Sequence, residues 1–298
     1  MSGRHPEWLR KKAPSPSILA EMKALLDGLS LHTVCQSALC PNLGECFSHQ
    51  TATFLIMGDI CTRNCRFCAI RSGKGFPLDP DEPWNVARAV GKLKLKHVVV
   101  TSVTRDDLPD GGATHFARTI NAVRQTNPQT TIEVLIPDFE GSSDALRIIV
   151  DSFPEIITHN VETVPCLYAE VRPNANYYRS LNLLQAVKSM DGKILTKSGL
   201  MLGLGEEHND VVAVMEDLRA VWCDFLTIGQ YLAPSSKHHP VIRYVTPEEF
   251  EQYKSLGERM GFSCVASSPF VRSSFRAAEM LAMLGHIASR NGQPLVSN

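Results

Sequence analysis

Six of the nine cysteines lie in two close triplets, a spacing that indicates two metal clusters. The first triplet is Cys35, Cys40 and Cys46, and the second triplet is Cys61, Cys65 and Cys68. The second triplet reads C-T-R-N-C-R-F-C, so one short loop can direct three thiolates to a common point. Three thiolates on a four-iron cluster leave one iron without a protein ligand, and an open iron can bind a substrate or cofactor.

Two other uses of six cysteines fit less well. Disulfide frameworks are typical of small secreted chains, whereas this chain has 298 residues and its first residues do not resemble a signal peptide. Structural zinc sites usually combine C-x2-C pairs across a longer loop, and neither triplet has that spacing. Iron–sulfur clusters are therefore the favoured interpretation.

The composition predicts a folded chain that binds neither nucleic acid nor membrane. It is 44% hydrophobic, enough to bury a core in one large domain with an extension or in two small domains. The formal net charge of -1 gives no basic field of the kind that nucleic-acid binders carry. No apolar run is long enough to cross a bilayer. We expect a cytoplasmic protein whose thiols stay reduced.

Apolar periodicity alternates along the chain between strand-like and helix-like segments. Strands are expected at residues 51–58, 97–100, 131–136, 155–162, 194–204 and 224–231. Helices are expected at residues 81–96, 112–126, 142–152, 177–190, 208–221 and 247–260. The last helix opens on a capping box formed by Thr246 and Glu249. The first strand runs directly into the second triplet, which places that loop at the carboxyl end of a strand.

Six strand–helix units in succession require parallel strands, because a helical crossover returns the chain in the same direction. A doubly wound open sheet satisfies the same count. The metal loop lies where barrels carry their sites, and this favours an α/β fold with an incomplete (β/α)6 barrel. We expect an N-terminal extension with the first triplet at residues 1–50 and the partial barrel at 51–262. A C-terminal segment with a helical tail, at 263–298, would close the barrel.

The loop of the second triplet resembles the radical S-adenosylmethionine signature, including an aromatic residue, Phe67, just before the third cysteine. The first triplet and the sequence Val271-Arg272-Ser273-Ser274-Phe275 are similar to those of the lipoyl synthase family in that superfamily. Further similar stretches lie at residues 6–9, 101–112, 159–163 and 171–173. One departure stands at Phe275, where the family usually has a tyrosine, so the phenolic hydroxyl is missing here.

The resemblance implies a sulfurtransferase that inserts sulfur at C6 and C8 of an octanoyl chain carried on a lysine. It implies two 4Fe-4S clusters and two molecules of S-adenosylmethionine per lipoyl group formed. The second triplet would bind the cluster that cleaves S-adenosylmethionine to a 5'-deoxyadenosyl radical. The first triplet, with Ser274 as fourth ligand, would hold an auxiliary cluster that is consumed as the sulfur donor. A serine alkoxide is a hard ligand that protonation releases more easily than a thiolate, which suits a cluster that must come apart.

Polar residues at strand ends are candidates for binding S-adenosylmethionine. Asn160 and Glu162 could hydrogen-bond the ribose hydroxyls, a task suited to an amide and a carboxylate. Thr101, Ser102 and Arg172 could meet the methionine end. The alternative for each residue is a polar group that is satisfied within the fold. Phe67 joins this set through its place in the signature.

The resemblance also implies protein partners. The substrates would be octanoylated lipoyl domains of 2-oxoacid dehydrogenase complexes or the glycine cleavage H protein. A reductant such as ferredoxin or flavodoxin and iron–sulfur carrier proteins would complete the cycle. Near the N-terminus, Arg4, Arg10, Lys11 and Lys12 surround Trp8, and this basic segment is either a solvated end or an attraction for an acidic carrier.

The remaining candidates carry simpler interpretations. Cys166, Cys223 and Cys264 lie in apolar sequence and are interpreted as core thiols. His238 and His239 fall in a polar loop and are expected to be solvated. Two rival functions remain open: a different radical enzyme, such as a biotin synthase relative or a methylthiotransferase, and a noncatalytic iron–sulfur or zinc protein.

Overall fold

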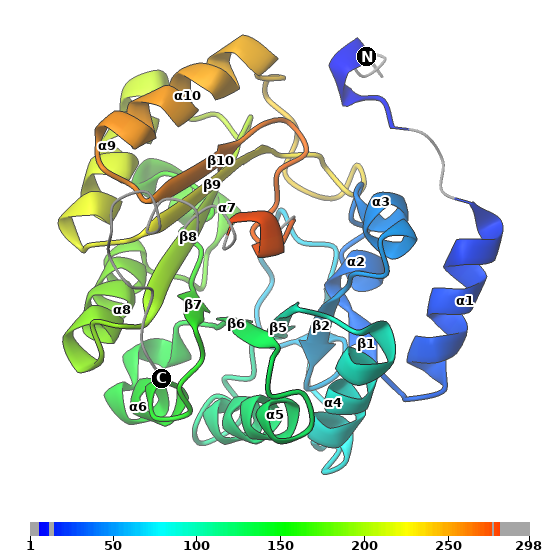
Figure 1. Ribbon diagram of the computed structural model, residues 1–298. Helices are drawn as coiled ribbons and strands as arrows, with labels where there is room; N and C mark the ends of the chain where they lie inside the picture. The colour runs from blue at the N-terminus through cyan, green and yellow to red at the C-terminus, as the bar shows by residue number, and fades with distance from the viewer. Residues whose placement is uncertain (1–5, 12–14, 276, 281–298) are drawn as a thin grey trace, which may run out of the picture.

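A curved sheet forms the centre of the computed structural model, which describes residues 6–11, 15–275 and 277–280 (Figure 1). Its strands are joined in the order β1-β2-β5-β6-β7-β8-β9-β10. Their bounds are β1 His32–Thr33, β2 Thr53–Ile56, β5 His97–Ser102, β6 Thr131–Leu135, β7 Ile156–Thr158, β8 Leu195–Leu202, β9 Phe225–Gln230 and β10 Cys264–Ser267. β1 is antiparallel to β2, and every other neighbouring pair is parallel.

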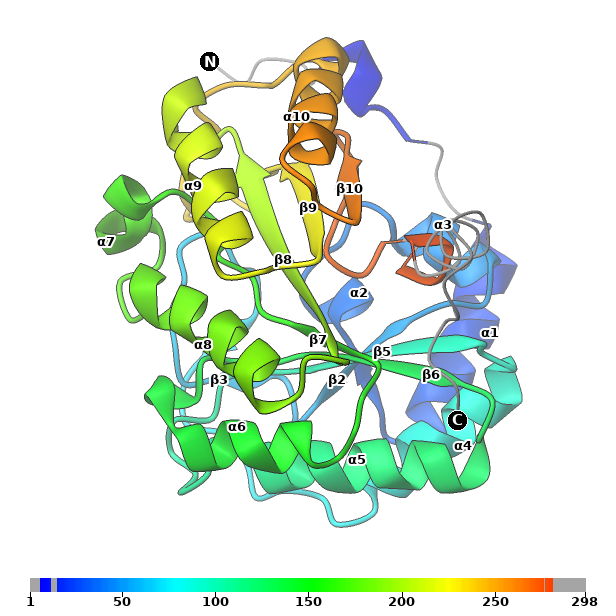
Figure 2. The same cartoon turned by 60° about the vertical axis from the view of Figure 1, so that its left-hand side comes forward.

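Long helices cover the outside of this sheet and carry the chain from one parallel strand to the next (Figures 1 and 2). They are α4 Glu82–Leu93, α5 Ala113–Thr126, α6 Ser143–Val150, α8 Tyr177–Met190, α9 His208–Ala220 and α10 Pro247–Arg259. Shorter helical turns lie between them at η2 Phe139–Gly141, η3 Pro165–Leu167 and α7 Tyr168–Val171. None of the helices in the described ranges has the length and apolar character of a membrane span.

The structure confirms the expected α/β fold with a mostly parallel sheet, and its strand order agrees with a partial barrel. From β2 to β10 the strands lie in the order in which they occur in the chain, whereas a doubly wound sheet reverses its order part-way. The predicted strands and the six predicted long helices all appear, with ends that differ by a few residues. The predicted capping box is also present, because Thr246 and Glu249 exchange hydrogen bonds at the start of α10.

The count of six parallel strands was one too low. β10 pairs with β9 along Cys264–Ser267 and adds a seventh parallel strand after α10. Among the described residues, β1 and β10 remain the two edges of the sheet and do not pair with each other. The barrel is therefore open on this side. Much of the expected helical tail falls at residues 281–298, outside the described part of the chain.

The open side is occupied by the N-terminal segment, the last described residues and the short helices between them (Figures 1 and 2). This segment contains η1 Glu7–Leu9, α1 Pro16–Asp27, α2 Val34–Ser37 and α3 Leu43–Ser48. After β2, a separate two-stranded sheet pairs β3 Ile60–Cys61 with β4 Arg71–Ser72.

The two faces of the sheet have different surroundings, as β5 illustrates. Val98 and Val100 point outward into the hydrophobic core under the helices. His97, Val99 and Thr101 alternate with them and line an internal cavity. Because both faces are covered, the strands read in the sequence as nearly continuous apolar runs, as parallel strands usually do.

Candidate active site

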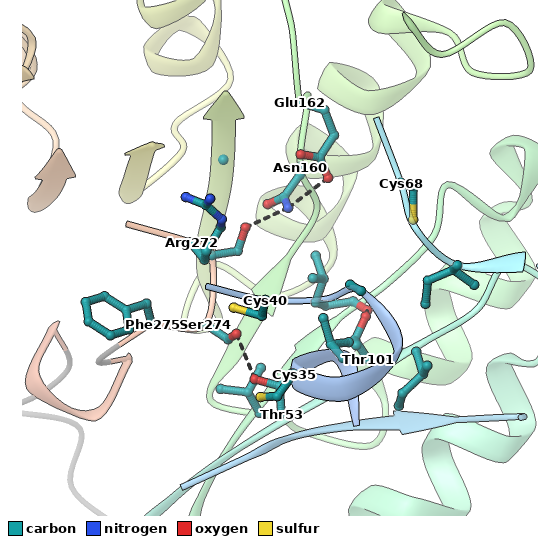
Figure 3. A pocket seen from close by; sticks show the side chains of 18 of the residues that line it. Cys35, Cys40, Thr53, Cys68, Thr101, Asn160, Glu162, Arg272, Ser274 and Phe275 are labelled. Atoms are coloured by element: carbon teal, nitrogen blue, oxygen red, sulfur yellow. Dashed lines mark hydrogen bonds between the residues drawn. The ribbon is translucent and has the colours of Figure 1, made fainter. Parts of the chain in front are cut away.

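Both cysteine triplets line a single cavity of about 590 Å³ inside the barrel. The cavity also contains every other residue that the sequence placed in the site: Phe67, Thr101, Ser102, Asn160, Glu162, Arg172 and Ser274. In Figure 3, Cys35 and Cys40 lie near Ser274, and Cys68 lies on another side of the pocket. The structure therefore brings together residues that are more than 230 positions apart in the chain.

The loop of the second triplet is anchored to the barrel through its backbone. Beyond β2 the chain turns sharply at Met57 and Gly58, which both have positive φ. The Thr62 N–H then donates to the Thr104 carbonyl at 3.0 Å, and the Arg66 N–H donates to the Val171 carbonyl at 2.9 Å. These bonds tie the loop to segments that follow two other parts of the sheet.

A buried ion-pair network holds the same loop from within. Arg63 Nε and Nη2 bind the two carboxylate oxygens of Asp106 at 2.8 and 2.9 Å, and Nη2 binds Asp138 at 2.6 Å. Asp138 also accepts a hydrogen bond from Arg179 at 3.2 Å. Although burial opposes it, the Arg63 guanidinium holds the pKa of Asp138 at about 2. A bidentate guanidinium fixes direction as well as distance, so the network orients the loop between Cys61 and Cys65.

A second loop covers the outer side of the second triplet. The His238 side chain donates from Nε2 to the Cys68 carbonyl at 3.1 Å. The His239 N–H donates to the Arg66 carbonyl at 2.9 Å, and its ring contacts the Leu204 carbonyl at 2.8 Å. Phe67 packs among apolar residues on the same side. This covering partly buries the loop, whose Asn64 and Arg66 side chains remain exposed.

Two thiols of the second triplet, Cys65 and Cys68, have a raised pKa in the absence of a cation. Burial raises the pKa of Cys68 to about 12, and burial also raises the pKa of Cys65 while Arg172 opposes that effect. Thiolate ligands must lose their protons when a metal binds. Filling this site therefore releases protons.

The first triplet lies on the short helices beside β2. Cys35 is on α2 and Cys46 on α3, and their thiols are hydrogen-bonded to each other. This shared proton raises the pKa of Cys35 and lowers the pKa of Cys46 to about 7. Burial raises the pKa of Cys40. Cys46 is thus the thiol of this triplet that is most readily ionised.

Thr53, the first residue of β2, connects the first triplet to Ser274. Its backbone N–H is hydrogen-bonded to the Cys35 thiol. Its hydroxyl donates to Ser274 Oγ at 2.7 Å, as the dashed line in Figure 3 shows. Thr53 therefore contacts both Cys35 and Ser274.

Two glycines allow the segment that carries Ser274 to lie against the inner face of the sheet. A Cβ atom on Gly229 of β9 would stand 2.0 Å from the Val271 carbonyl oxygen. A Cβ atom on Gly199 of β8 would stand 2.8 Å from Ser273 Oγ. The Val271 oxygen belongs to the backbone and cannot move aside as a side chain can, so Gly229 is the position that must be glycine for the segment to pack here.

The cysteines of the cavity can be compared with the two kinds of metal centre that thiolates form. Among residues 6–11, 15–275 and 277–280, no three His, Cys, Asp or Glu side chains converge closely enough to share a single metal ion. Thiolates on one zinc ion would lie about 3.8 Å apart, given a bond of about 2.3 Å and tetrahedral angles. In a four-iron cluster each thiolate binds a different iron and stands farther from the others. Two sets of three thiols in one cavity are a donor set that suits iron–sulfur clusters.

Several buried polar atoms in the cavity point to a bound polar molecule. Ser102 Oγ, Asn160 Oδ1 and Arg172 Nε are buried and have no hydrogen-bond partner within the described structure. Buried polar groups are normally paired, and three orphans in one cavity are unusual. A cofactor with hydroxyl, amino and carboxylate groups would satisfy them.

Other polar side chains of the predicted set are already engaged. Glu162 accepts a hydrogen bond from Asn160 Nδ2 at 3.0 Å, and burial raises its pKa. Its φ of 65° is unusual for a residue with a side chain and marks strain at this strand end. Thr101 donates its hydroxyl proton to the Leu135 carbonyl at 2.8 Å, so it can only accept from a ligand. Ser102 is the freer hydroxyl of the two.

Three interpretations of the sequence need correction. Cys166 is exposed on η3, and Cys264 is partly exposed on β10, so only Cys223 is a core thiol. His239 is 5% exposed, because its loop packs against the second triplet. Lys11 is not a solvated end, since it contacts Glu45 and Asn42. Arg4 and Lys12 lie outside the described residues.

Sequence reasoning missed the residues that position the site. Arg63 lies between Cys61 and Cys65, and this position could have suggested that it orients the loop. Its carboxylate partners follow two different strands, so no local pattern pairs them. Ser273 was overlooked beside Ser274, although its hydroxyl accepts a hydrogen bond from Asn160 at 2.6 Å.

Comparison with known proteins places the chain in a family. Residues 55–218 match the model of the Radical SAM superfamily. A lipoyl synthase from Caldanaerobacter subterraneus subsp. tengcongensis is 58% identical over 93% of this chain and 97% of its own length. A lipoyl synthase from Alkaliphilus metalliredigens is 57% identical over 93% of this chain and 96% of its own.

Solved structures support the fold at much lower identity. The [FeFe]-hydrogenase maturase HydG has a TM-score of 0.59 at 15% identity and covers 90% of this chain and 67% of its own. Methylornithine synthase (PylB) has a TM-score of 0.54 at 11% identity, over 96% of this chain and 91% of its own. Since the sequence relatives match along nearly the whole length and the fold agrees, this chain is an enzyme that belongs to the lipoyl synthase family of the radical SAM superfamily.

Proposed function

We propose that this enzyme inserts two sulfur atoms, at C6 and C8, into an octanoyl chain carried on a lysine of a lipoyl carrier domain. Membership of the family gives the coarser statement, which is lipoyl cofactor synthesis by radical SAM chemistry. One observation supports the finer proposal: the two triplets and Ser274 line one cavity. An octanoyl chain in this cavity would be within reach of both triplets.

The proposal assigns each group a place. The second triplet would hold a 4Fe-4S cluster, with S-adenosylmethionine bound by Asn160, Glu162, Ser102 and Arg172. The first triplet and Ser274 would hold the auxiliary 4Fe-4S cluster. When bound, these groups supply a radical able to take hydrogen from an unactivated methylene, together with the sulfur that replaces it.

The chain's own residues would bind, orient and exclude water. Arg63 and the loop that carries His238 hold the second triplet in place and cover it. Thr53 holds Ser274 next to Cys35. An apolar cavity wall keeps water away from a reactive carbon radical, which would otherwise be lost to side reactions.

The partners follow from the same proposal. The acyl chain would arrive on an octanoylated lipoyl domain of a 2-oxoacid dehydrogenase complex or on the glycine cleavage H protein. A low-potential donor such as ferredoxin or flavodoxin would supply electrons. Iron–sulfur carrier proteins would rebuild the auxiliary cluster after it has given up its sulfur.

The direct test is mass spectrometry of an octanoyl-lysine peptide. The peptide would be incubated without oxygen with reconstituted enzyme, S-adenosylmethionine and dithionite. The proposal expects the peptide to gain two sulfur atoms and to lose two hydrogens. A peptide that is unchanged while 5'-deoxyadenosine accumulates would refute sulfur insertion and favour a different radical reaction.

Three alanine variants separate the two triplets. Cys68→Ala should abolish formation of 5'-deoxyadenosine, because the second triplet would lose a ligand. Cys40→Ala should spare that cleavage and eliminate sulfur transfer. Cys166→Ala is the matched control, because this thiol is exposed and outside the cavity. Lipoyl product from the Cys40 variant would contradict the donor role.

A further inference from the structure

Lys11 contacts the two segments that carry the proposed ligands of the auxiliary cluster. Its Nζ donates to Asn42 Oδ1 at 2.6 Å and to Glu45 Oε2 at 2.7 Å, between Cys40 and Cys46. The same ammonium lies 4.6 Å from the ring centroid of Phe270 and 5.1 Å from that of Phe275. Lys11 therefore joins the N-terminal segment to both sides of the first triplet.

Asn42 connects Lys11 to the C-terminal segment by a second route. The Asn42 side chain is 1% exposed, and its Nδ2 donates to the Phe270 carbonyl at 2.7 Å. One amide thus binds Lys11 with its oxygen and the C-terminal segment with its nitrogen. Both contacts span large distances in sequence, so local chain geometry alone does not produce them.

Three of the residues in these contacts lie one or two positions from a proposed ligand of the auxiliary cluster. Cys40 lies two residues before Asn42, Cys46 directly follows Glu45, and Ser274 directly precedes Phe275. The side chain of Lys11 is 23% exposed, so most of it is removed from water. An ammonium over aromatic rings is attracted to their faces, and this attraction increases when water is excluded.

We propose that Lys11 is a positioning residue that holds Ser274 over the first triplet. The inference rests on the proposed function only in taking the first triplet as the site of a cluster. With Lys11 in place, the segment that carries Phe270 and Phe275 cannot move away from α3 without breaking two ring contacts. Loss of the lysine frees that segment, and Ser274 then leaves the cluster more easily.

This role also explains how Phe275 can stand where the family usually has tyrosine. A cation–π contact uses the face of the ring, which phenylalanine and tyrosine both provide. The missing hydroxyl therefore does not affect this contact. Leucine at this position would keep the apolar volume and lose the attraction.

The test measures iron loss from the reconstituted holoenzyme to a chelator under anaerobic conditions. Parallel measurements on Cys68→Ala and Cys40→Ala assign the kinetic phases to the first and second triplets. In Lys11→Met, we expect iron to leave the first triplet roughly tenfold faster, the factor that corresponds to a change of about 1.4 kcal/mol. The phase of the second triplet and the rate of 5'-deoxyadenosine formation should not change.

Matched variants make the result specific. Lys11→Arg should restore most of the wild-type rate, because arginine keeps the charge and stacks on aromatic rings. Lys23→Met is the control, since Lys23 makes only an exposed ion pair with Asp27 on α1. Phe275→Tyr should behave as wild type. Phe275→Leu should accelerate iron loss less than Lys11→Met, because Lys11 keeps its contact with Phe270. The Lys11→Met, Phe275→Leu double variant should lose iron no faster than Lys11→Met alone.

Wild-type iron loss from the first triplet in Lys11→Met would overturn the proposal. Equal acceleration at both triplets would also overturn it, because that pattern means general destabilisation. If reconstituted Cys40→Ala contains as much iron as the wild type, the first triplet holds no cluster. That result would refute the proposed function itself and would be recognised without the Lys11 variants.

Discussion

Replacing Arg63 with methionine would remove the centre of the buried ion-pair network and leave two carboxylates behind. Arg63 is 6% exposed, and Asp138 is 2% exposed. Asp106 is 24% exposed and can be hydrated after the change. Asp138 keeps its contact with Arg179 at 3.2 Å, so its charge is only partly uncompensated.

These contacts set the expected magnitude. Breaking a buried ion pair by removing one partner costs about 3 to 5 kcal/mol, because a buried charge loses its compensation. The remaining partner of Asp138 and the exposure of Asp106 place this case near the lower end. A loss of about 3 kcal/mol in a domain of this size lowers the melting temperature by roughly 6 to 12 °C.

Thermal unfolding of the anaerobic holoenzyme, followed by circular dichroism, would measure this shift. Arg71→Met on β4, which follows this loop, is the matched control, because its ion pair with Asp59 is more exposed and should change stability by less than about 1 kcal/mol. Arg63→Met combined with Asp138→Asn should recover part of the loss, since the second change removes the buried charge. A melting temperature for Arg63→Met within 1 °C or so of the Arg71→Met value would refute the reasoning.

Two further predictions concern pH and backbone packing. Burial lowers the pKa of His159 to about 4, so the folded state prefers neutral imidazole and loses stability as pH falls below the unfolded pKa of about 6.5. The free energy of unfolding should fall by about 2 kcal/mol between pH 7 and pH 5. The variant His159→Asn can still donate to the Ile136 carbonyl, and its melting temperature should depend less on pH. Gly229→Ala places a Cβ atom 2.0 Å from the Val271 oxygen and should displace the segment that carries the proposed serine ligand, which faster iron loss to a chelator would reveal. Gly192→Ala, whose Cβ would meet its nearest atom at 3.7 Å, should behave as wild type in that assay.

Local patterns were enough to predict most of the barrel. The apolar run before the second triplet became β2, and the capping box at Thr246 became the start of α10, because each signal lies within a few neighbouring residues. β10 was missed because only Val265 of its four residues is fully buried, so it lacks the apolar run that marked the other strands.

The site was predictable where its residues are contiguous and obscure where they meet only in the fold. The spacing of Cys61, Cys65 and Cys68 carries its own chemical meaning. Arg63 gives no sign in the sequence that it will bind carboxylates 43 and 75 residues away. A basic segment near a terminus usually indicates a solvated end. Nothing local distinguishes Lys11, whose partners come from α3 and from the C-terminal segment of the chain.

The hydrogen bond between Thr53 and Ser274 joins residues 221 positions apart, which has a consequence for how the protein is made. A ribosome completes the loop of the second triplet early, and its three cysteines are contiguous from that moment. The neighbourhood of the first triplet stays unfinished until residue 274 has emerged, because domains are synthesised from the N-terminus onward. If both triplets hold the proposed clusters, the second triplet can receive its iron before the first during biogenesis.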